Sequence, residues 1–124
     1  MRSELGRVRG LGAAREGVGH WWRQRVTAAA LVPLMVWFVG MVISLKGADH
    51  ETVRAFFKAP GHATAMVLVV GVALYHALLG VRVVIEDYVH HETGKLVGLV
   101  LVQMMTVLLV LFAVVAVLAI AYGG

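Results

Sequence analysis

Cysteine is absent from the 124-residue sequence. Without a thiol, this polypeptide cannot form a disulfide bond, hold an iron–sulfur cluster through cysteine or supply a cysteine nucleophile. Any such chemistry in an assembly that contains the chain must therefore come from its partners. The same absence means that the redox compartment cannot be inferred from cysteine usage.

Charged residues are also scarce. They make up 15% of the sequence, whereas hydrophobic residues make up 60%, a balance too apolar for a soluble domain of this length. The composition predicts an integral membrane protein. The net charge of +4 comes largely from arginines near the N-terminus, so we relate it to membrane orientation and anionic lipid, and expect no nucleic-acid partner.

Three long apolar segments predict transmembrane helices at residues 26–45, 63–85 and 96–122. Each is long enough to cross a hydrocarbon core of about 30 Å. We therefore expect an all-α integral membrane protein, with a polar basic arm at residues 1–25 and a three-helix anchor domain at residues 26–124. Three such helices contain too few polar groups for a self-contained transporter, which indicates that they form part of a larger heteromeric helix bundle.

The segment that joins the first two spans, residues 46–62, is polar and predicts a loop outside the bilayer. Within it, Phe56 and Phe57 favour a short helix at the membrane interface. We expect His50 and His62 of this loop to be solvated, because a metal site would need more ligands at suitable spacing.

His76 is the unusual residue of the second span, because an ionisable side chain inside a membrane helix is a functional candidate. The small residues Ala73, Ala77 and Gly80 keep the surrounding helix surface low, so that a large neighbour can approach. Two interpretations stay open at this point. His76 either hydrogen-bonds a neighbouring helix or serves as an axial ligand of haem iron.

Asp87 and Tyr88 lie where the second span reaches the membrane edge. The eleven positions from His76 to Asp87 make about three helical turns, which places both on nearly the same face, roughly 16 Å apart along the axis. Tyr88 also fits an interfacial aromatic belt, as do Trp21 and Trp22. Arg25, before the first span, either extends to lipid phosphate or meets the carboxylates of a bound cofactor.

Two segments, HWWRQRVTAAALVPLMVWF (20–38) and YHALLGVRVVIEDYVHHE (75–92), together with the three-span layout, resemble the family of hydrophobic membrane anchors of succinate dehydrogenase. The resemblance covers essentially all of the chain beyond the arm. It implies that the anchor joins a sister cytochrome b subunit to hold haem b and a ubiquinone site, with the iron–sulfur and flavoprotein subunits docked on top. Succinate is then oxidised in the flavoprotein, and electrons pass through iron–sulfur clusters to ubiquinone.

Carried over residue by residue, the resemblance implies that His76 is an axial ligand of the haem iron and that Arg25 is a haem-propionate partner. It also implies that Tyr88 donates a hydrogen bond to a quinone carbonyl and that Asp87 shares that pocket. Arg82 departs from the expected pattern, in which this position is polar and uncharged. We expect no catalytic residue in this chain, which does not catalyse a reaction on its own. The alternative is a three-span scaffold or assembly factor in which His76 only packs.

Positive charge predicts the orientation of the three spans. Six arginines lie in the arm, and Arg82 and Lys95 flank the second turn, whereas residues 46–62 contain three lysines and arginines. The positive-inside rule then places the N-terminus in the cytoplasm and the C-terminus outside, in the periplasm if the membrane is a bacterial inner membrane.

A reporter fused after Gly124 tests this orientation. Alkaline phosphatase, which folds only outside the cytoplasm, should be active there, and a fluorescent protein that folds only inside should be dark, because the arginine-rich end is retained in the cytoplasm. A cytoplasmic signal from a fusion that still functions would mean that the orientation or the number of spans is wrong.

Overall fold

The computed structural model describes residues 13–123, and over them the chain is helical. The elements in order are α2 (Ala13–Ser44), α3 (His50–Lys58), α4 (Pro60–Tyr88) and α5 (Glu92–Tyr122). The three long helices each contain a segment apolar and long enough to cross a membrane, with the first such segment at Val18–Ser44. The prediction of an all-α protein with three membrane spans is thus confirmed, as is the short helix between the first two spans.

Helix α2 begins at Ala13, well before the predicted start of the first span at residue 26. Residues 13–25 contain Ala, Arg, Glu and Gln and no proline, so they continue the helix although their charges keep them out of hydrocarbon. Charge therefore marks the edge of the predicted span but not the end of the helix. The rest of the predicted arm, residues 1–12, lies outside the described residues.

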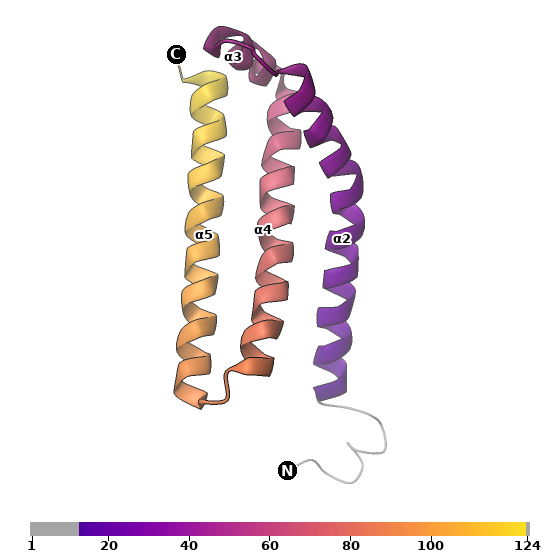
Figure 1. Ribbon diagram of the computed structural model, residues 1–124, viewed down its shortest axis with the longest axis vertical. Helices are drawn as coiled ribbons and strands as arrows, with labels where there is room; N and C mark the ends of the chain where they lie inside the picture. Colours follow the sequence, from indigo (N-terminus) through magenta and orange to yellow (C-terminus); the bar gives the residue numbers. More distant parts are fainter. Residues whose placement is uncertain (1–12, 124) are drawn as a thin grey trace.

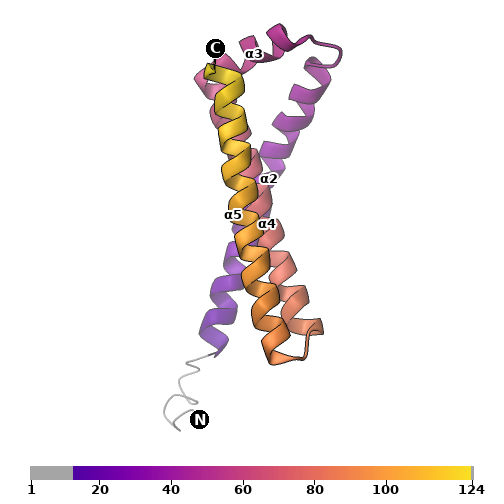
Figure 2. The same ribbon diagram turned by 90° about the vertical axis from the view of Figure 1, so that its left-hand side faces the viewer.

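Helix α4 lies between α2 and α5 and packs against both (Figure 1). Helices α4 and α5 run antiparallel and side by side, whereas α2 crosses α4 at an angle, so that the two diverge on both sides of the crossing (Figure 2). At the carboxyl end of α2 the gap is spanned by α3, which extends from α2 to the other two helices. The amino end of α2 and the α4–α5 turn are both at the opposite end of the bundle (Figure 1).

Few side chains are buried inside this bundle. The most buried large one is Leu79 of α4, which is 2% exposed, while large apolar residues such as Met105 and Phe112 of α5 are mostly exposed. In a bilayer, exposed apolar side chains meet lipid tails or neighbouring helices at little cost. Much of the surface of the chain is therefore suited to lipid and to other membrane subunits.

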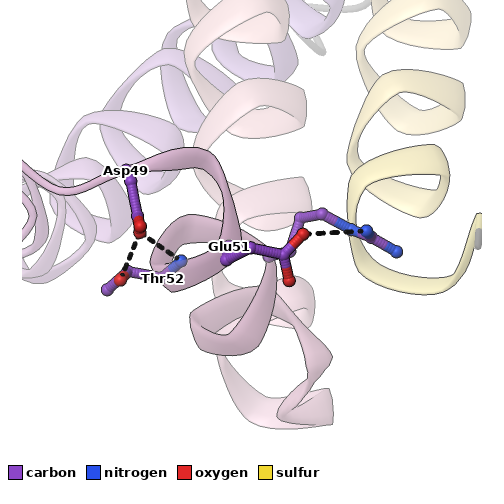
Figure 3. A network of polar contacts seen from close by, with 4 residues as sticks. Asp49, Glu51 and Thr52 are labelled. Carbon is purple, nitrogen blue, oxygen red and sulfur yellow. Dashed lines mark hydrogen bonds and ion pairs between the residues drawn. The ribbon is translucent and has the colours of Figure 1, made fainter.

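Helix α3 starts at a well-formed N-cap (Figure 3). Gly47, with φ at 76°, adopts a left-handed conformation that lets the chain turn out of α2. Asp49 Oδ1 then accepts hydrogen bonds from Thr52 Oγ1 at 2.6 Å and from Thr52 N at 2.9 Å. The nearby Glu51–Arg54 ion pair, at 3.6 Å, is exposed on its acidic side and adds little. The cap therefore fixes where α3 begins.

Aromatic packing fastens α3 to the bundle, and it makes the expectation of a solvated His62 wrong. The His62 ring stacks on Phe56 with centroids 3.9 Å apart, and His62 Nδ1 lies 2.9 Å from the Phe56 carbonyl oxygen. Trp37 of α2 also approaches Phe56, with ring centroids 6.4 Å apart. Pro60 at the start of α4 forces a turn directly after α3, which brings His62 against it. His50 is exposed, as expected.

The cap predicts how α3 responds to pH. Hydrogen bonds from the Thr52 hydroxyl, and then from its backbone N–H, hold the pKa of Asp49 below its ordinary value of 3.8. Stabilisation by the carboxylate is therefore complete above that value and is lost as the pH falls through the lower folded-state pKa. Amide hydrogen exchange in α3, corrected for the intrinsic rate, should increase on acidification. Asp49→Ala should increase it at every pH.

Asp49→Asn is the matched control, because asparagine caps helices and does not titrate. It should keep α3 protected at neutral pH and remove the Asp49 contribution to the acid response. Unchanged exchange in Asp49→Ala would mean that aromatic packing alone holds α3 in place.

Candidate functional site

The packing of α2 against α4 brings two residues 49 positions apart into contact: Thr27 Oγ1 lies 2.9 Å from His76 Nδ1. Both side chains are half-buried. Thr27 Oγ1 also lies 2.9 Å from the Arg23 carbonyl oxygen and 3.1 Å from that of Gln24, the usual partners of a helical threonine. The hydrogen bond to a neighbouring helix that the sequence left open for His76 is thus made within the chain. It engages one ring nitrogen, so Nε2 remains the nitrogen through which His76 can act as a ligand.

Two further polar residues share the face of α2 that carries Thr27. His20, Gln24 and Thr27 are spaced i, i+4 and i+7, which places them in one row along the helix. Gln24 Nε2 lies 3.9 Å from the position that a Cβ would take at Gly80, one turn of α4 beyond His76. This polar row therefore extends along the α2–α4 interface from His76 towards the carboxyl end of α4.

His20 Nε2 and Gln24 Oε1 are buried and have no hydrogen-bond partner among the described residues. Buried polar atoms in native proteins are nearly always paired, so this face suits a polar group from outside the described chain. His20, Gln24 and the Thr27 contact were not predicted from the sequence. The signal was present as a row of polar residues at helical spacing that runs into an apolar span.

Arg25 lies on a different face of α2. Two helix positions separate it from Thr27, which is about 200° of rotation, and its guanidinium lies 5.4 Å from the centroid of the Trp21 ring. The structure therefore does not bring Arg25 to the His76 side of the helix. Trp21 and Trp22 are exposed, with ring centroids 6.0 Å apart, as residues of an interfacial belt are.

Asp87 and Tyr88 form the carboxyl end of α4, which lies at the same end of the bundle as the amino end of α2 (Figure 1). Both side chains are exposed, Tyr88 to 76%. They are roughly 16–18 Å from His76 along the helix axis. Within this chain they do not share one pocket with His76. They are accessible to a ligand or subunit at the membrane edge.

The described residues also bear on what kind of metal site is feasible. Within residues 13–123 no three histidine, aspartate or glutamate side chains gather as metal ligands. Haem iron needs only axial ligands from protein, since the porphyrin supplies four nitrogens. His76 Nε2 can be such a ligand, and the unpaired ring nitrogen of His20, when it carries a hydrogen, can donate to a carboxylate of the kind that haem carries. The residues present therefore fit a haem group.

Fold and site together define a class of protein: a multi-pass membrane protein with three long apolar helices and a row of partly unpaired polar groups between two of them. Known proteins identify the class further. The family model for succinate dehydrogenase/fumarate reductase transmembrane subunits matches residues 1–120. The chain belongs to this family.

Individual relatives give the particular type of subunit. The succinate dehydrogenase hydrophobic membrane anchor subunit of Rickettsia conorii is 32% identical over 117 residues, which cover 94% of this chain and 93% of the relative. That of Paracoccus denitrificans is 37% identical over 86 residues, or 69% and 67% of the two chains. No solved structure matches significantly. The chain is thus a membrane anchor subunit of the succinate dehydrogenase complex, whose other subunits are its partners.

Proposed function

We propose that this anchor subunit helps to bind haem b and to form the site at which ubiquinone is reduced. The observation that carries the proposal is the His76–Thr27 contact, in which one imidazole nitrogen is held by α2 and the other is left for a ligand. An imidazole held through one nitrogen is the usual state of a histidine that ligates a metal. The buried and unpaired ring nitrogen of His20, one donor that a haem carboxylate could meet, supports the same assignment.

In this proposal His76 supplies one axial ligand and the sister cytochrome b subunit shares the haem. When bound, the haem supplies one-electron redox chemistry, and the chain contributes ligation and the local field. Arg25 is proposed as a haem-propionate partner on the strength of the family resemblance. In its present position the guanidinium packs on Trp21, on the face of α2 that points away from Thr27, so the proposal for Arg25 rests on the resemblance alone.

Tyr88 and Asp87 are proposed to serve the quinone at the cytoplasmic membrane edge. The Tyr88 hydroxyl donates a hydrogen bond to a quinone carbonyl, and the Asp87 carboxylate orients neighbouring cations. The two side chains leave the helix about 100° apart, so they cannot both point at one atom and must have different roles. Their exposure at the end of α4 supports a pocket completed by other subunits.

The chain acts within a longer electron path. Succinate is oxidised at a flavin in the flavoprotein subunit, and electrons pass through the clusters of the iron–sulfur subunit to ubiquinone. We place the anchor in the bacterial inner membrane with a cytoplasmic N-terminus, so that Tyr88 and the docked subunits share one side. The chain then contributes positioning and electrostatics rather than bond chemistry of its own.

The competing function is a scaffold or assembly factor in which His76 only pairs with Thr27, and His76→Ala separates the two. Loss of an axial ligand should remove or alter the low-spin b-type signal in the optical and paramagnetic resonance spectra of the assembled complex. His90→Ala, a change of an exposed histidine outside the helices, should leave both spectra unchanged. A His76→Ala signal with the original intensity, potential and spin state would favour the scaffold.

The quinone assignment is tested by Tyr88→Phe and Asp87→Asn. Removal of the hydroxyl deletes one hydrogen bond worth roughly 0.5–1.5 kcal/mol, so quinone reduction by succinate should slow about twofold to tenfold, and more if the quinone oxygen carries charge in the transition state. Asp87→Asn removes the charge and should slow the same reaction. Succinate oxidation with an artificial acceptor that draws electrons upstream should survive in both.

The chain offers a matched control for each change. Tyr122 is exposed at the other end of the bundle, and Glu86 is an exposed acid beside Asp87. Tyr122→Phe and Glu86→Gln should therefore reduce quinone at the original rate. Normal quinone reduction in Tyr88→Phe would mean that Tyr88 is only an interfacial aromatic residue. Equal loss of quinone reduction and of succinate oxidation with the artificial acceptor would indicate failed assembly.

A further inference from the structure

The Thr27 hydroxyl has a single proton and three close polar neighbours. The carbonyl oxygens of Arg23 and Gln24 lie 2.9 and 3.1 Å from Oγ1, and His76 Nδ1 lies at 2.9 Å. A carbonyl oxygen can only accept a hydrogen bond. If the hydroxyl proton pointed at His76, the lone pairs of Oγ1 would face the lone pairs of two carbonyls at close range. The proton must therefore point to the carbonyls of α2.

With its proton directed to the backbone, Thr27 Oγ1 can only accept from His76. Nδ1 must then carry a hydrogen, and in a neutral imidazole the lone pair lies on Nε2. We propose that Thr27 is a positioning residue that fixes His76 as the Nδ1–H tautomer and aims the Nε2 lone pair at the haem iron. This inference rests on the proposed haem ligation by His76 and adds to it the residue that prepares the ligand.

The position of Thr27 makes it suited to this role. Its oxygen is bound to the backbone of α2, so it cannot follow the imidazole if the ring rotates. Threonine is also stiff about χ1, which limits the hydroxyl to few directions. The plane of the imidazole on α4 is thus set by the backbone of α2. The acceptor is a neutral hydroxyl rather than a carboxylate, so Nδ1 keeps its proton. The lone pair on Nε2 is then that of a neutral imidazole, which can bind a metal.

Thr27→Val in the complete succinate dehydrogenase complex is the direct test, because valine keeps the branched shape and removes the hydroxyl. Loss of such a supporting hydrogen bond typically weakens metal binding about tenfold to a hundredfold. Haem transfer to excess apomyoglobin should accelerate by that factor. The g-values of the low-spin haem and its midpoint potential should also shift, because the ring is free to rotate. Neither spectroscopic change is expected from a purely structural role of Thr27.

Two controls separate the hydrogen bond from general effects of the substitution. Thr27→Ser retains the hydroxyl and should restore the original g-values, potential and haem retention. Thr106→Val makes the same change in α5, where the hydroxyl donates to the Val102 carbonyl at 2.8 Å. It should leave all three haem properties unchanged. If Thr27→Val does not assemble, Thr27→Cys replaces the hydroxyl by a thiol, a weak acceptor, and is expected to show the same shifts. Its matched control is Thr27→Ser, which lacks the same methyl group and keeps the hydroxyl.

Failure of the role of Thr27 can be told apart from failure of haem ligation by His76. The role of Thr27 would be overturned if Thr27→Val showed the original g-values, midpoint potential and rate of haem transfer. Where valine prevents assembly, the same result in Thr27→Cys would overturn it. The same would follow if Thr27→Ser behaved like Thr27→Val. His76→Ala is measured beside them. If it retains the low-spin signal, haem ligation by His76 itself is wrong, and the two failures are thereby told apart.

Discussion

The interhelical hydrogen bond between Thr27 and His76 is the contact that orders the rest of this structure. In energy it is modest, because such bonds in membranes average about 0.6 kcal/mol. Apolar packing of α4 against α2 and α5 holds the bundle together. The bond instead selects a rotation of α2 relative to α4. That rotation turns His20 and Gln24 inward as a row and leaves Arg25 facing outward.

The span pattern and the site differ in how far the sequence predicts them. Three apolar segments of 20, 23 and 27 residues have one stable solution in a bilayer, since every backbone polar group must be paired within a helix. His76 stands out because ionisable residues are rare in such segments. Its partner could not be predicted, because a threonine in a helix normally bonds its own backbone and no pattern fixes the relative rotation of two helices. His62 was missed because its stacking depends on the turn at Pro60.

The distribution of exposed groups is that of one component of an assembly rather than of a self-sufficient protein. Tyr88 and Asp87 project from the end of α4, and much of α5 presents apolar side chains outward. In membranes such surfaces gain little from being hidden from lipid, so association depends on close packing and on polar contacts. The unpaired atoms of His20 and Gln24 are available for polar contacts of that kind.

Helix α2 continues without interruption from Ala13 to Thr27, a length of about 21 Å. A helix of this length is stiff, and Pro33 lies beyond Thr27, so the proline of this helix introduces no bend between its amino end and the site. A small tilt applied at the amino end therefore reaches the imidazole as a change in ring angle. A subunit that binds the amino end of α2 would therefore influence the orientation of the His76 ring within the membrane.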